Sequence, residues 1–271
     1  TPVRKRATEL GLKVITPEDM SCPDVVSAIK EVQPDVIAVV AFGQKLPKEV
    51  LEIPKYACLN VHPSLLPKYR GGNPIQRQLM AGETEVGVSI MYMDEGMDSG
   101  DICLQRVVPV GPDETLGTLE KRLSVVGADA LLESIHAIYE GSAPRIAQDE
   151  KVKTVAFHLK PGEDVIDWTR PATEIHNLVR ALSPAPGAVT TFGDERIKIW
   201  QTELADSNER EDSDSAPGTI IGIEESKLLV RCGEGLLAVT EVQPEGKRRM
   251  SAKAFLAGRQ KGPFRFGDLD K

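Results

Sequence analysis

The apolar run from Val36 to Phe42 is the feature that most limits how this chain can fold. Its seven residues, Val-Ile-Ala-Val-Val-Ala-Phe, are continuous and rich in β-branched side chains. A run of this kind is typical of a strand that is covered on both faces of a parallel sheet. It is also the longest apolar run of the chain, whereas a transmembrane helix needs about 20 such residues. The sequence therefore predicts a strand in the core of an α/β domain and no membrane-spanning helix.

Helical and strand-like spacings alternate around this run. Between residues 23 and 32, Val25, Val26, Ile29 and Val32 recur at helical spacing and share one stripe. Alternation of helices with strands predicts a Rossmann-like, open and parallel-rich α/β sheet. The expected helices are residues 4–10, 23–32, 47–53, 74–80 and 114–139, and the expected strands are residues 13–15, 35–42, 57–61, 86–93 and 102–110.

The second half of the chain has a different pattern. Short strand-like runs separated by turn residues replace the alternation, as in a small, OB-like β-barrel. An acidic stretch, residues 203–215, is expected to be a solvated loop. The predicted domains are residues 1–150, an α/β domain; residues 151–180, a linker and a helix; and residues 181–271, a C-terminal β-barrel. The expected barrel strands are residues 188–192, 197–202, 218–223, 228–231 and 236–241.

Charge and cysteine content exclude several classes of protein. The formal net charge is −8, so the chain is not basic overall, although a local basic patch is compatible with this balance. Aromatic residues make up only 4% of the chain, which disfavours base stacking on exposed rings as the main nucleic-acid contact. The four cysteines are scattered without a CxxC pair, so neither a disulfide framework nor a zinc knuckle is expected and a reducing cytosol is the default.

The segment from Leu59 to Pro74 carries the most information about chemistry. Asn60 and His62 are two residues apart at the end of an expected strand, so their side chains project from the same face. Ligands of open α/β sheets bind beyond the carboxyl ends of the strands. A second polar loop, Asp-Glu-Gly-Met-Asp-Ser-Gly-Asp at residues 94–101, follows the next strand and could converge on the same crevice.

Residue types alone leave these assignments open. A single histidine after a strand is more often a structural hydrogen-bonding group than a catalytic one. Asn60 can cap a turn, and Asp98, which lies between glycines, can be an ordinary turn residue. A metal site of His62 with Asp98 or Cys58 matches no recognised ligand spacing. The segment Ser64–Pro67 can be a rigid connector after the strand.

Two motifs in this region resemble the formyltetrahydrofolate-dependent formyltransferase family. They are NVHPSLLPKYRGGNPIQ at residues 60–76 and GETEVGVSIMYMDEGMDSGDI at residues 82–102. Members of that family carry an Asn-x-His pair before Ser-Leu-Leu-Pro and an aspartate in the later glycine-flanked loop. At these positions the chain has Asn60, His62 and Asp98.

Within this family, the chain is most similar to the members that formylate methionyl-tRNA. Residues 39–47, VVAFGQKLP, resemble their folate-binding loop, and residues 243–251, QPEGKRRMS, resemble their second-domain signature. The resemblance implies transfer of a formyl group from the co-substrate 10-formyltetrahydrofolate to the α-amino group of initiator methionyl-tRNA. This is a step of translation initiation, and it implies no metal ion.

The resemblance also implies a role for each site residue. The family reaction passes through a tetrahedral intermediate that bears an oxyanion. Asn60 is expected to donate to that oxyanion, His62 to stabilise it and transfer protons, and Asp98 to orient His62 and relay protons. The expected folate contacts are Ser64, Leu65, Leu66 and Pro67, which line the crevice, and backbone groups of Gln44, Lys45 and Leu46 at the pterin.

The carboxyl-terminal end is locally basic. Residues 244–271 contain eight Lys or Arg and three acids. Such a patch can neutralise several phosphates of a nucleic acid even though the chain as a whole is acidic. Composition alone, however, favours a solvated basic tail. The resemblance implies that Lys247, Arg248 and Arg249 contact the tRNA backbone. The resemblance further implies a monomer in a bacterial cytoplasm or an organellar matrix.

The chain departs from the family pattern at its start. The family normally begins with a strand, a helix, a second strand and a basic loop, whereas this chain begins after them, at Thr1. We expect a unit of roughly 30–40 residues, about one βαβ unit, to be missing. The sheet is then expected to be incomplete at its N-terminal side, with exposed edges.

Three other functions share part of these features. The first is formyl transfer to another amine, such as an amino-sugar nucleotide or glycinamide ribotide, because the Asn-x-His and aspartate core does not discriminate acceptors. The second is hydrolysis of 10-formyltetrahydrofolate, with water in place of the amine. The third is a non-catalytic RNA- or folate-binding protein. The β-rich second domain with its basic end favours tRNA as the acceptor.

Overall fold

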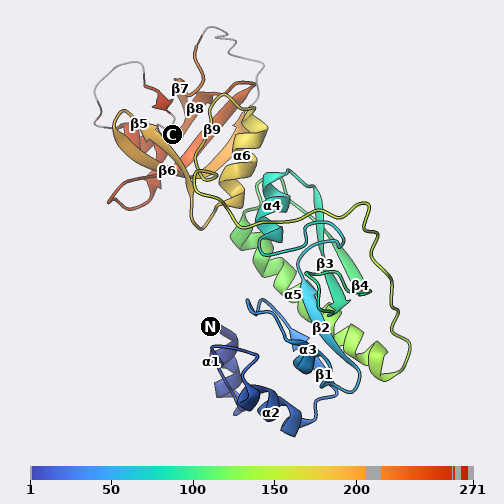
Figure 1. Ribbon diagram of the computed structural model, residues 1–271. Coiled ribbons are helices and arrows are strands. Elements are labelled where there is room, and N and C mark those ends of the chain that lie inside the picture. The colour runs from blue at the N-terminus through green and yellow to red at the C-terminus, as the bar shows by residue number, and fades with distance from the viewer. Residues whose placement is uncertain (1, 206–214, 258, 260–263, 268–271) are drawn as a thin grey trace.

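Two lobes, joined by an extended linker, meet at helices α4 (Pro74–Met80) and α6 (Ala172–Ala181) in the computed structural model (Figure 1). The structure describes residues 2–205, 215–257, 259 and 264–267. The first lobe is an α/β domain and the second is a curled antiparallel sheet, which confirms the predicted fold class. The other elements of the first lobe are α1 (Pro2–Glu9), α2 (Pro23–Val32), α3 (Lys48–Leu51), α5 (Leu116–Tyr139), β1 (Val36–Val39), β2 (Ala57–His62), β3 (Glu85–Tyr92) and β4 (Ile102–Pro109).

The described sheet of the first lobe has four strands in the order β1-β2-β3-β4. Strands β1 and β2 are parallel, but β2–β3 and β3–β4 are antiparallel. The short loop 93–101 joins β3 to β4, and a connection of that length can only reverse the direction of the chain. Parallel pairing is therefore confined to β1–β2 among the described strands. Helix α5 packs across β2, β3 and β4.

Strand β1 is shorter and less buried than the sequence predicts. Val36 packs against the cluster on the α5 side, whereas Ile37 and Val39 pack against α2 and α3, so both faces are covered as expected. However, β1 lies at one edge of the described sheet, and Val40 and Phe42 beyond its end are 56% and 42% exposed. The prediction that the whole run is core is therefore wrong for its second half.

The segment of residues 13–15, which was predicted to be a strand, forms none. In the described chain, no strand lies between α1 and α2, and residues 12–15 are exposed. A strand requires a neighbouring backbone to satisfy its N–H and C=O groups, and this segment pairs with no described strand. The five predicted helices are all present, with ends that differ from the prediction by a few residues.

Local signals explain where the helices begin and end. Helix α2 begins with Pro23, whose missing N–H costs nothing in the first turn, and it ends before Gln33, which has a left-handed φ of 50°. Helix α5 is capped by Thr115 and Thr118, because each side chain bonds the backbone N–H of the other residue. This cap fixes the first turn of α5, which faces the candidate site.

The second lobe is a barrel, as predicted. Its strands follow the order β11-β5-β6-β9-β8-β7, with β10 on β9. The Ile220 N–H donates to Phe264 O and the Phe266 N–H donates to Gly218 O, each at 2.8 Å, which closes β7 against β11. The elements are β5 (Ala188–Phe192), β6 (Glu195–Ala205), β7 (Ile220–Glu224), β8 (Lys227–Arg231), β9 (Leu236–Pro244), β10 (Met250–Ser251), α7 (Ala252–Leu256) and β11 (Phe266–Gly267).

The prediction that residues 203–215 form a loop is wrong for the first three of them. Residues 203–205 belong to β6 and pair with β9, so they are strand and not loop. Glu203 also receives a hydrogen bond from Lys227 Nζ at 2.6 Å, which favours the extended strand. Residues 206–214 lie outside the described residues, so the rest of the predicted loop stays a prediction.

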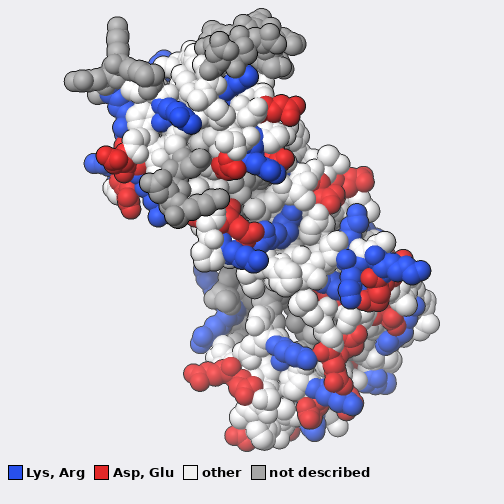
Figure 2. Space-filling model, turned by 45° about the horizontal axis from the view of Figure 1, so that its top comes forward, with Lys and Arg blue, Asp and Glu red and all other residues white. Residues whose placement is uncertain are grey.

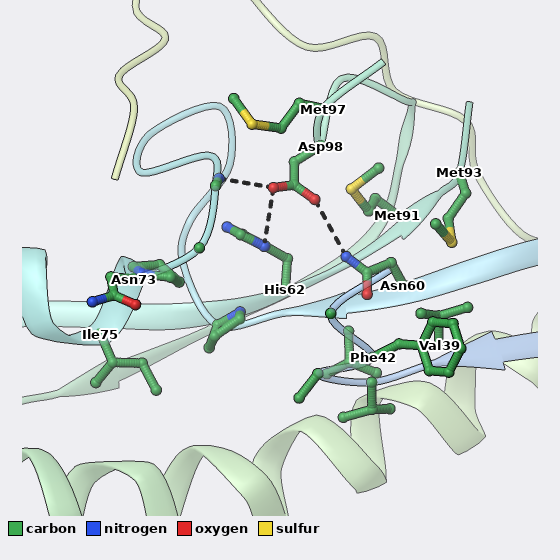
Figure 3. Close-up of a pocket in the computed structure, with 18 of the residues that line it drawn as sticks. Val39, Phe42, Asn60, His62, Asn73, Ile75, Met91, Met93, Met97 and Asp98 are labelled. Carbon is green, nitrogen blue, oxygen red and sulfur yellow. Dashed lines mark hydrogen bonds and ion pairs between the residues drawn. The ribbon is translucent and has the colours of Figure 1, made fainter. Parts of the chain in front are cut away.

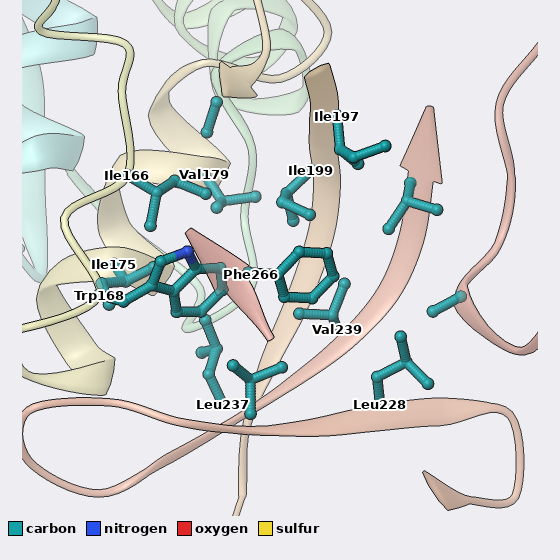
Figure 4. Packing of buried hydrophobic residues seen from close by; sticks show 14 of the residues in the cluster. Ile166, Trp168, Ile175, Val179, Ile197, Ile199, Leu228, Leu237, Val239 and Phe266 are labelled. Carbon is teal, nitrogen blue, oxygen red and sulfur yellow. The ribbon is translucent and has the colours of Figure 1, made fainter. Parts of the chain in front are cut away.

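The core of the barrel includes helix α6 and the chain before it (Figure 4). Trp168 stacks on Phe266 with ring centroids 5.4 Å apart, and its indole N–H donates to Thr190 Oγ1 at 2.9 Å. Ile175 and Val179 of α6 are buried in the same cluster. Burial of one large apolar side chain contributes about 1.5–3 kcal/mol, so this packing holds α6 to the barrel. The predicted domain boundary at residue 181 stays a prediction.

Two side chains of α6 connect the barrel to the first lobe. His176 is buried, with Nδ1 3.0 Å from Thr202 Oγ1 and Nε2 2.9 Å from Pro112 O. Arg180 is also buried, and it donates to Gly111 O and to Glu114 O, each at 3.4 Å. Because these bonds reach the loop before α5, the barrel is fixed beside the first turn of that helix.

Arg77 of α4 fastens the linker to the first lobe. Its guanidinium donates to Phe157 O at 2.9 Å, to His158 O at 3.1 Å, and to both carboxylate oxygens of Glu163 at 3.0 and 2.7 Å. Earlier in the linker, Val155 forms a parallel bridge with Arg70. The linker is therefore bonded to the first lobe along residues 154–163 and is not a free tether.

The Arg77–Glu163 contact is expected to stabilise the fold in a pH-dependent way. Hydrogen bonds from Arg77 and from the Lys160 N–H lower the pKa of Glu163 from 4.5 to about 2. Since the pKa is lower in the folded state, the stabilisation is complete above about pH 4.5 and is lost as the pH falls toward 2. Glu163→Gln should therefore lower the urea midpoint near neutrality and leave it unchanged near pH 2.

Helix α6 offers a matched control for that experiment. Glu174 pairs with Arg170 at i,i+4 on the exposed side of α6, where a pair contributes about 0.3–0.5 kcal/mol. Glu174→Gln should move the urea midpoint little at either pH. Equal stability of Glu163→Gln and the unchanged chain near neutrality would contradict the role given to Glu163.

The surface carries charges of both signs over both lobes (Figure 2). On the face shown, lysines and arginines are interspersed with acidic residues, in keeping with the net charge of −8. All four cysteines lie in the described chain and are free. None of the helices in the described residues is long and apolar enough to cross a membrane.

Candidate active site

The three predicted catalytic side chains lie together (Figure 3). Asn60 and His62 come from the end of β2, and Asp98 comes from the loop between β3 and β4. Asn60 Nδ2 donates to Asp98 Oδ1 at 3.4 Å, and His62 Nδ1 lies 3.6 Å from Asp98 Oδ2. One carboxylate therefore contacts both an amide and an imidazole. The predicted convergence of the two loops is found in the structure.

A cavity of about 1040 Å³ opens beside these side chains. Its volume is slightly above the range of about 300–1,000 Å³ typical of small-molecule sites, which is sufficient for a large ligand or for parts of two ligands. The first turn of α5 forms one wall and the loop after β1 forms another. The lining residues are 39–46, 60–63, 71–76, 88, 91, 93–98, 116, 120, 123, 124 and 158.

Backbone groups hold Asp98 in place. The Gly71 N–H donates to Asp98 Oδ2 at 2.8 Å, so one carboxylate oxygen is bonded before any ligand binds. Gly71 has a φ of +109°, and a Cβ there would lie 3.1 Å from Ala156 O, so a side chain would be strained in this position. Asp98 itself has a φ of +51°, which is uncommon for a residue other than glycine. The site thus depends on two unusual backbone conformations.

The hydrogen bonds of His62 assign its tautomer. The imidazole is buried, and Nε2 lies 2.9 Å from Tyr69 O. A carbonyl oxygen only accepts, so Nε2 carries a hydrogen. In the neutral ring Nδ1 is then an acceptor that faces Asp98, and in the imidazolium Nδ1 donates toward Asp98. His62 can therefore take up or release a proton at Nδ1 while its ring stays fixed.

Tyr69 supplies the carbonyl that fixes His62, and Tyr69 is itself held at both ends. Its N–H donates to Thr154 Oγ1 at 2.8 Å and its phenol donates to Glu83 Oε1 at 2.7 Å. Burial and the adjacent Glu83 raise the pKa of the Tyr69 phenol, so it is a stable hydrogen donor. Tyr69 has a left-handed φ of 59°. These contacts make Tyr69 a structural support of the site.

Cys58 is not available as a nucleophile. It lies on β2 two residues before Asn60, and its side chain is buried. Burial raises the pKa of the Cys58 thiol to about 11. Since the thiolate is the reactive form, Cys58 is inert near neutrality. Among the described residues, no three His, Cys, Asp or Glu side chains gather as metal ligands.

The residues expected to contact a folate separate into two groups. Gln44, Lys45 and Leu46 line the cavity, in the loop that follows β1. The Gln44 side chain bonds Met20 N at 3.2 Å and Pro17 O at 3.3 Å, so it orders the cavity wall. Ser64–Pro67, in contrast, do not line the cavity.

The segment Ser64–Pro67 is bonded to the protein around it. Ser64 is fully buried, its hydroxyl donates to Lys68 O at 2.7 Å, and its carbonyl accepts from Ser89 Oγ at 2.6 Å. Leu66 is buried as well. These contacts match the rigid connector that the residue types alone allowed. A direct folate contact of Ser64, Leu65, Leu66 or Pro67 stays a prediction.

The three basic residues expected to contact RNA lie in the turn between β9 and β10. Lys247 and Arg248 are exposed. Arg249 stacks on Trp200, with its guanidinium carbon 3.5 Å from the ring centroid, and it donates to Pro184 O at 3.1 Å. Arg249 is exposed as well, although it also makes these contacts within the protein. A tRNA contact of Lys247, Arg248 or Arg249 stays a prediction.

Sequence reasoning missed several residues around the site. Buried Arg70 and half-buried Gln148 form a hydrogen-bonded network behind Asp98, and His158 of the linker lines the cavity beside Gly72. Arg70 lies within the KYRGG part of the motif, but no spacing rule gave it a role. Gln148 and His158 follow α5 in a stretch without periodicity, so nothing in their neighbourhood marked them.

Comparison with known proteins agrees with this geometry. The family model described as "Formyl transferase" matches residues 3–135, and the model described as "Formyl transferase, C-terminal domain" matches residues 158–260. The methionyl-tRNA formyltransferase of Symbiobacterium thermophilum is 46% identical over 95% of this chain and 78% of its own length. That of Carboxydothermus hydrogenoformans is 45% identical over 95% of this chain and 82% of its own.

Solved structures show the same fold at lower identity. A methionyl-tRNA formyltransferase from Clostridium thermocellum has a TM-score of 0.58 and 22% identity, covering 76% of this chain and 88% of that one. HypX from Aquifex aeolicus, in complex with tetrahydrofolic acid, has a TM-score of 0.65 and 18% identity, covering 92% of this chain and 45% of that one. Because both family models match and close relatives align over almost its whole length, the chain belongs to the formyl transferase family.

Proposed function

We propose that this chain transfers a formyl group from 10-formyltetrahydrofolate to the α-amino group of methionyl-tRNA. One observation carries the proposal: Asn60, His62 and Asp98 meet at a single cavity. The names of the relatives, at 45% and 46% identity, support methionyl-tRNA as the acceptor. The folate-bound structural neighbour supports a folate as the donor.

The reaction makes three demands on the site. The uncharged amine bonds to the formyl carbon, and the carbonyl oxygen becomes an oxyanion. The bond from this carbon to N10 of the folate then breaks, N10 takes up a proton and the new amide nitrogen loses one. The site must therefore stabilise the oxyanion and provide a route for protons. A free α-amino group has a pKa of about 7.7–8.0, so deprotonation itself needs little help.

Asn60 is suited to stabilise the oxyanion. Its amide nitrogen donates without titrating, and in the structure it is held near Asp98 Oδ1 at the cavity wall. The contact of 3.4 Å is long for a hydrogen bond, so the amide can turn to a developing negative charge at little cost. A donor that already lies at the cavity wall needs only this small rotation as the charge forms.

The pair of His62 and Asp98 is suited to move protons. His62 Nδ1 faces Asp98 Oδ2 at 3.6 Å, and Nε2 is committed to Tyr69 O. A proton from the amine can therefore enter at Nδ1 or at the carboxylate, and the same pair can return it toward N10. Because the ring is held by Tyr69, the proton moves without rotation of the side chain.

The cavity walls are suited to hold the two substrates. Backbone groups at Gln44, Lys45 and Leu46 offer donors and acceptors to a pterin ring. The first turn of α5 lies at the junction with the barrel, where an acceptor bound by both lobes can enter. We assign the folate to the wall formed by the loop after β1 and the amine to the side of α5.

A product assay tests the proposed function. The protein is incubated with 10-formyltetrahydrofolate and methionyl-tRNA, and the products are separated. Formyl-methionyl-tRNA is expected. Free formate alone would indicate hydrolysis, and no consumption of the folate would indicate a non-catalytic protein. Formylation of an amino-sugar nucleotide in place of methionyl-tRNA would indicate a different acceptor.

The basic turn is expected to contribute to tRNA affinity through Lys247 and Arg248. Each phosphate contact adds about 0.9 to the slope of log K against log salt concentration on duplex DNA, and about 0.7 on a single strand. The double variant Lys247→Ala, Arg248→Ala should therefore bind tRNA more weakly, with a slope reduced by about 2. Filter binding over a series of salt concentrations measures this slope, and folate binding should not change.

A charge-matched control separates this turn from overall charge. Lys13 and Lys30 are exposed lysines in the part of the chain around α1 and α2, at the opposite end of the molecule. The double variant Lys13→Ala, Lys30→Ala removes the same charge and should keep the slope of the unchanged protein. An unchanged slope in the Lys247, Arg248 variant would remove this turn from the interface.

A further inference from the structure

We propose that Gln148 and Arg70 are positioning residues that determine where the Asp98 carboxylate lies. The proposal rests on the proposed function, since it concerns the proton route that Asp98 and His62 provide. Neither residue lines the cavity. They lie behind Asp98 and join three segments that are far apart in the sequence: the loop after β2, the loop after β3 and the chain after α5.

Gln148 uses its whole hydrogen-bonding capacity in this network. Its Nε2 donates to Asp98 O at 2.9 Å and to Gly100 O at 2.7 Å. Its Oε1 accepts from Arg70 Nε at 3.0 Å and from Arg70 Nη2 at 2.7 Å. Only one orientation of the amide satisfies these partners, because carbonyl oxygens need a donor and the guanidinium needs an acceptor. Gln148 therefore connects the backbone on both sides of Ser99 to Arg70.

Arg70 is a buried cation that is fixed at its side chain and at its backbone. It is 5% exposed. Its N–H donates to Thr154 O at 2.9 Å, and its carbonyl accepts from the Ala156 N–H at 2.6 Å. A buried arginine with bonds of both kinds has little freedom to move. Arg70 thus provides a fixed point from which Gln148 can hold the loop of Asp98.

Asp98 is held from two directions by this arrangement. Gln148 bonds its backbone carbonyl, while Gly71, the residue after Arg70, bonds its carboxylate at 2.8 Å. The left-handed φ of Asp98 costs free energy, and bonds to the flanking carbonyls offset that cost. Both contacts lead back to Arg70. The distance from the carboxylate to His62 Nδ1 is therefore determined by Arg70 and Gln148.

Glu150 also bonds Arg70, but it lies on the exposed side of the network. It bonds Arg70 Nη2 at 2.7 Å from the solvent side, and its side chain is 56% exposed. Its carboxylate bonds Arg70 and Lys153. Removing its charge alters the pairing of Arg70 but leaves every bond of Gln148 in place. Glu150→Gln is therefore a matched control.

The decisive variant is Gln148→Glu. A glutamate still accepts from Arg70, so the buried cation stays paired, but it cannot donate to Asp98 O or Gly100 O. We expect kcat for formyl transfer to fall by about 10- to 100-fold, the range for a displacement of about 1 Å at a reacting group. The KM for the folate should stay within about twofold, because the loop after β1 is untouched. Glu150→Gln should retain the kcat of the unchanged protein.

A second variant and a direct readout separate positioning from folding. Gln148→Met has no charge and no donor, and it should show the same loss of kcat in protein that remains folded by circular dichroism. In both Gln148 variants, the nitrogen-15 resonance of His62 Nδ1 should move from its position in the unchanged chain, and in Glu150→Gln it should stay. A role confined to stability would lower the melting temperature and leave kcat and this resonance unchanged.

Failure of this proposal differs from failure of the proposed function. If the unchanged chain formylates no methionyl-tRNA, the His62 resonance still reports whether Gln148 positions Asp98. The positioning role is overturned if Gln148→Glu and Gln148→Met keep near-native kcat and an unmoved resonance. It is also overturned if a crystal structure of Gln148→Glu shows the Asp98 carboxylate still bonded to the Gly71 N–H and facing His62 at its present distance.

Discussion

The His62→Ala variant is expected to lose formyl transfer by about 10²- to 10⁴-fold in kcat, the contribution of a positioned acid–base group. The imidazole is the group that can exchange a proton at Nδ1 beside Asp98, and alanine leaves the carboxylate without that partner. The fold should persist, because the loss to stability is chiefly the hydrogen bond to Tyr69 O, and a carbonyl left without its partner costs about 1–3 kcal/mol. Single-turnover formation of formyl-methionyl-tRNA measures the effect.

His136 provides a matched control for the His62→Ala variant. His136 lies exposed in the last turn of α5, away from the cavity lining. His136→Ala should formylate methionyl-tRNA at the rate of the unchanged protein. His62→Gln retains a donor for Tyr69 O but cannot exchange a proton, so it should resemble His62→Ala. A near-native rate in either His62 variant would show that the imidazole is dispensable.

Asn60→Ala is expected to lower kcat by about 10²- to 10³-fold, which corresponds to about 3–4 kcal/mol of transition-state stabilisation. The amide is a neutral donor at the cavity wall, and its removal leaves a developing oxyanion without that partner. Asn60→Asp should be at least as slow, since a second carboxylate beside Asp98 repels the same charge. Measured affinity for the folate should change little in both variants.

Asn177 is the matched control for this prediction. It lies on α6 at the junction of the lobes, where its Oδ1 accepts from Arg180 Nε at 2.9 Å. Asn177→Ala should reduce the melting temperature and retain kcat. If Asn60→Ala also lost only stability, the oxyanion role of Asn60 would be excluded.

The positions of Asn60 and His62 could be predicted because they depend on local periodicity. Two residues at a spacing of two on a buried strand must share a face, and β2 runs from Ala57 to His62, one residue beyond the predicted 57–61. The convergence of Asp98 was also predicted correctly, but not for the right reason. Strand β3 runs antiparallel to β2, so its end lies opposite Leu59, and the loop that follows must fold back to bring Asp98 to His62.

The support of Asp98 could not be predicted from one sequence. Gln148 bonds a carbonyl 50 residues away and a guanidinium 78 residues away, and no periodicity relates such positions. Arg249 illustrates the same limit. Its stacking on Trp200 depends on the pairing of β6 with β9 and could not be predicted from its charge, and its expected contact with tRNA stays a prediction. Predictions from pattern therefore located the three candidate catalytic side chains and missed the residues that hold them.

The failed strand prediction at residues 13–15 and the exposed end of the run at Phe42 have one physical cause. Hydrophobicity and β-branching describe what a side chain prefers, whereas strand formation and burial depend on neighbours. Residues 13–15 pair with no described strand, and β1 borders only β2 among the described strands. By contrast, β2 and β3 have a neighbour on each side, and there the predicted and observed limits nearly coincide.

The linker has a consequence for how the two lobes act together. Its backbone at Thr154 and Ala156 is bonded to Arg70, and further along Arg77 holds Phe157 and His158. Force exerted on the barrel by a bound RNA would thus be transmitted to the loop of Gly71 through short hydrogen bonds, because the linker between the lobes is not a flexible segment. Lengthening this connector near Thr154 or Ala156 would therefore disturb the backbone of Arg70, next to Gly71, and not only the span between the lobes.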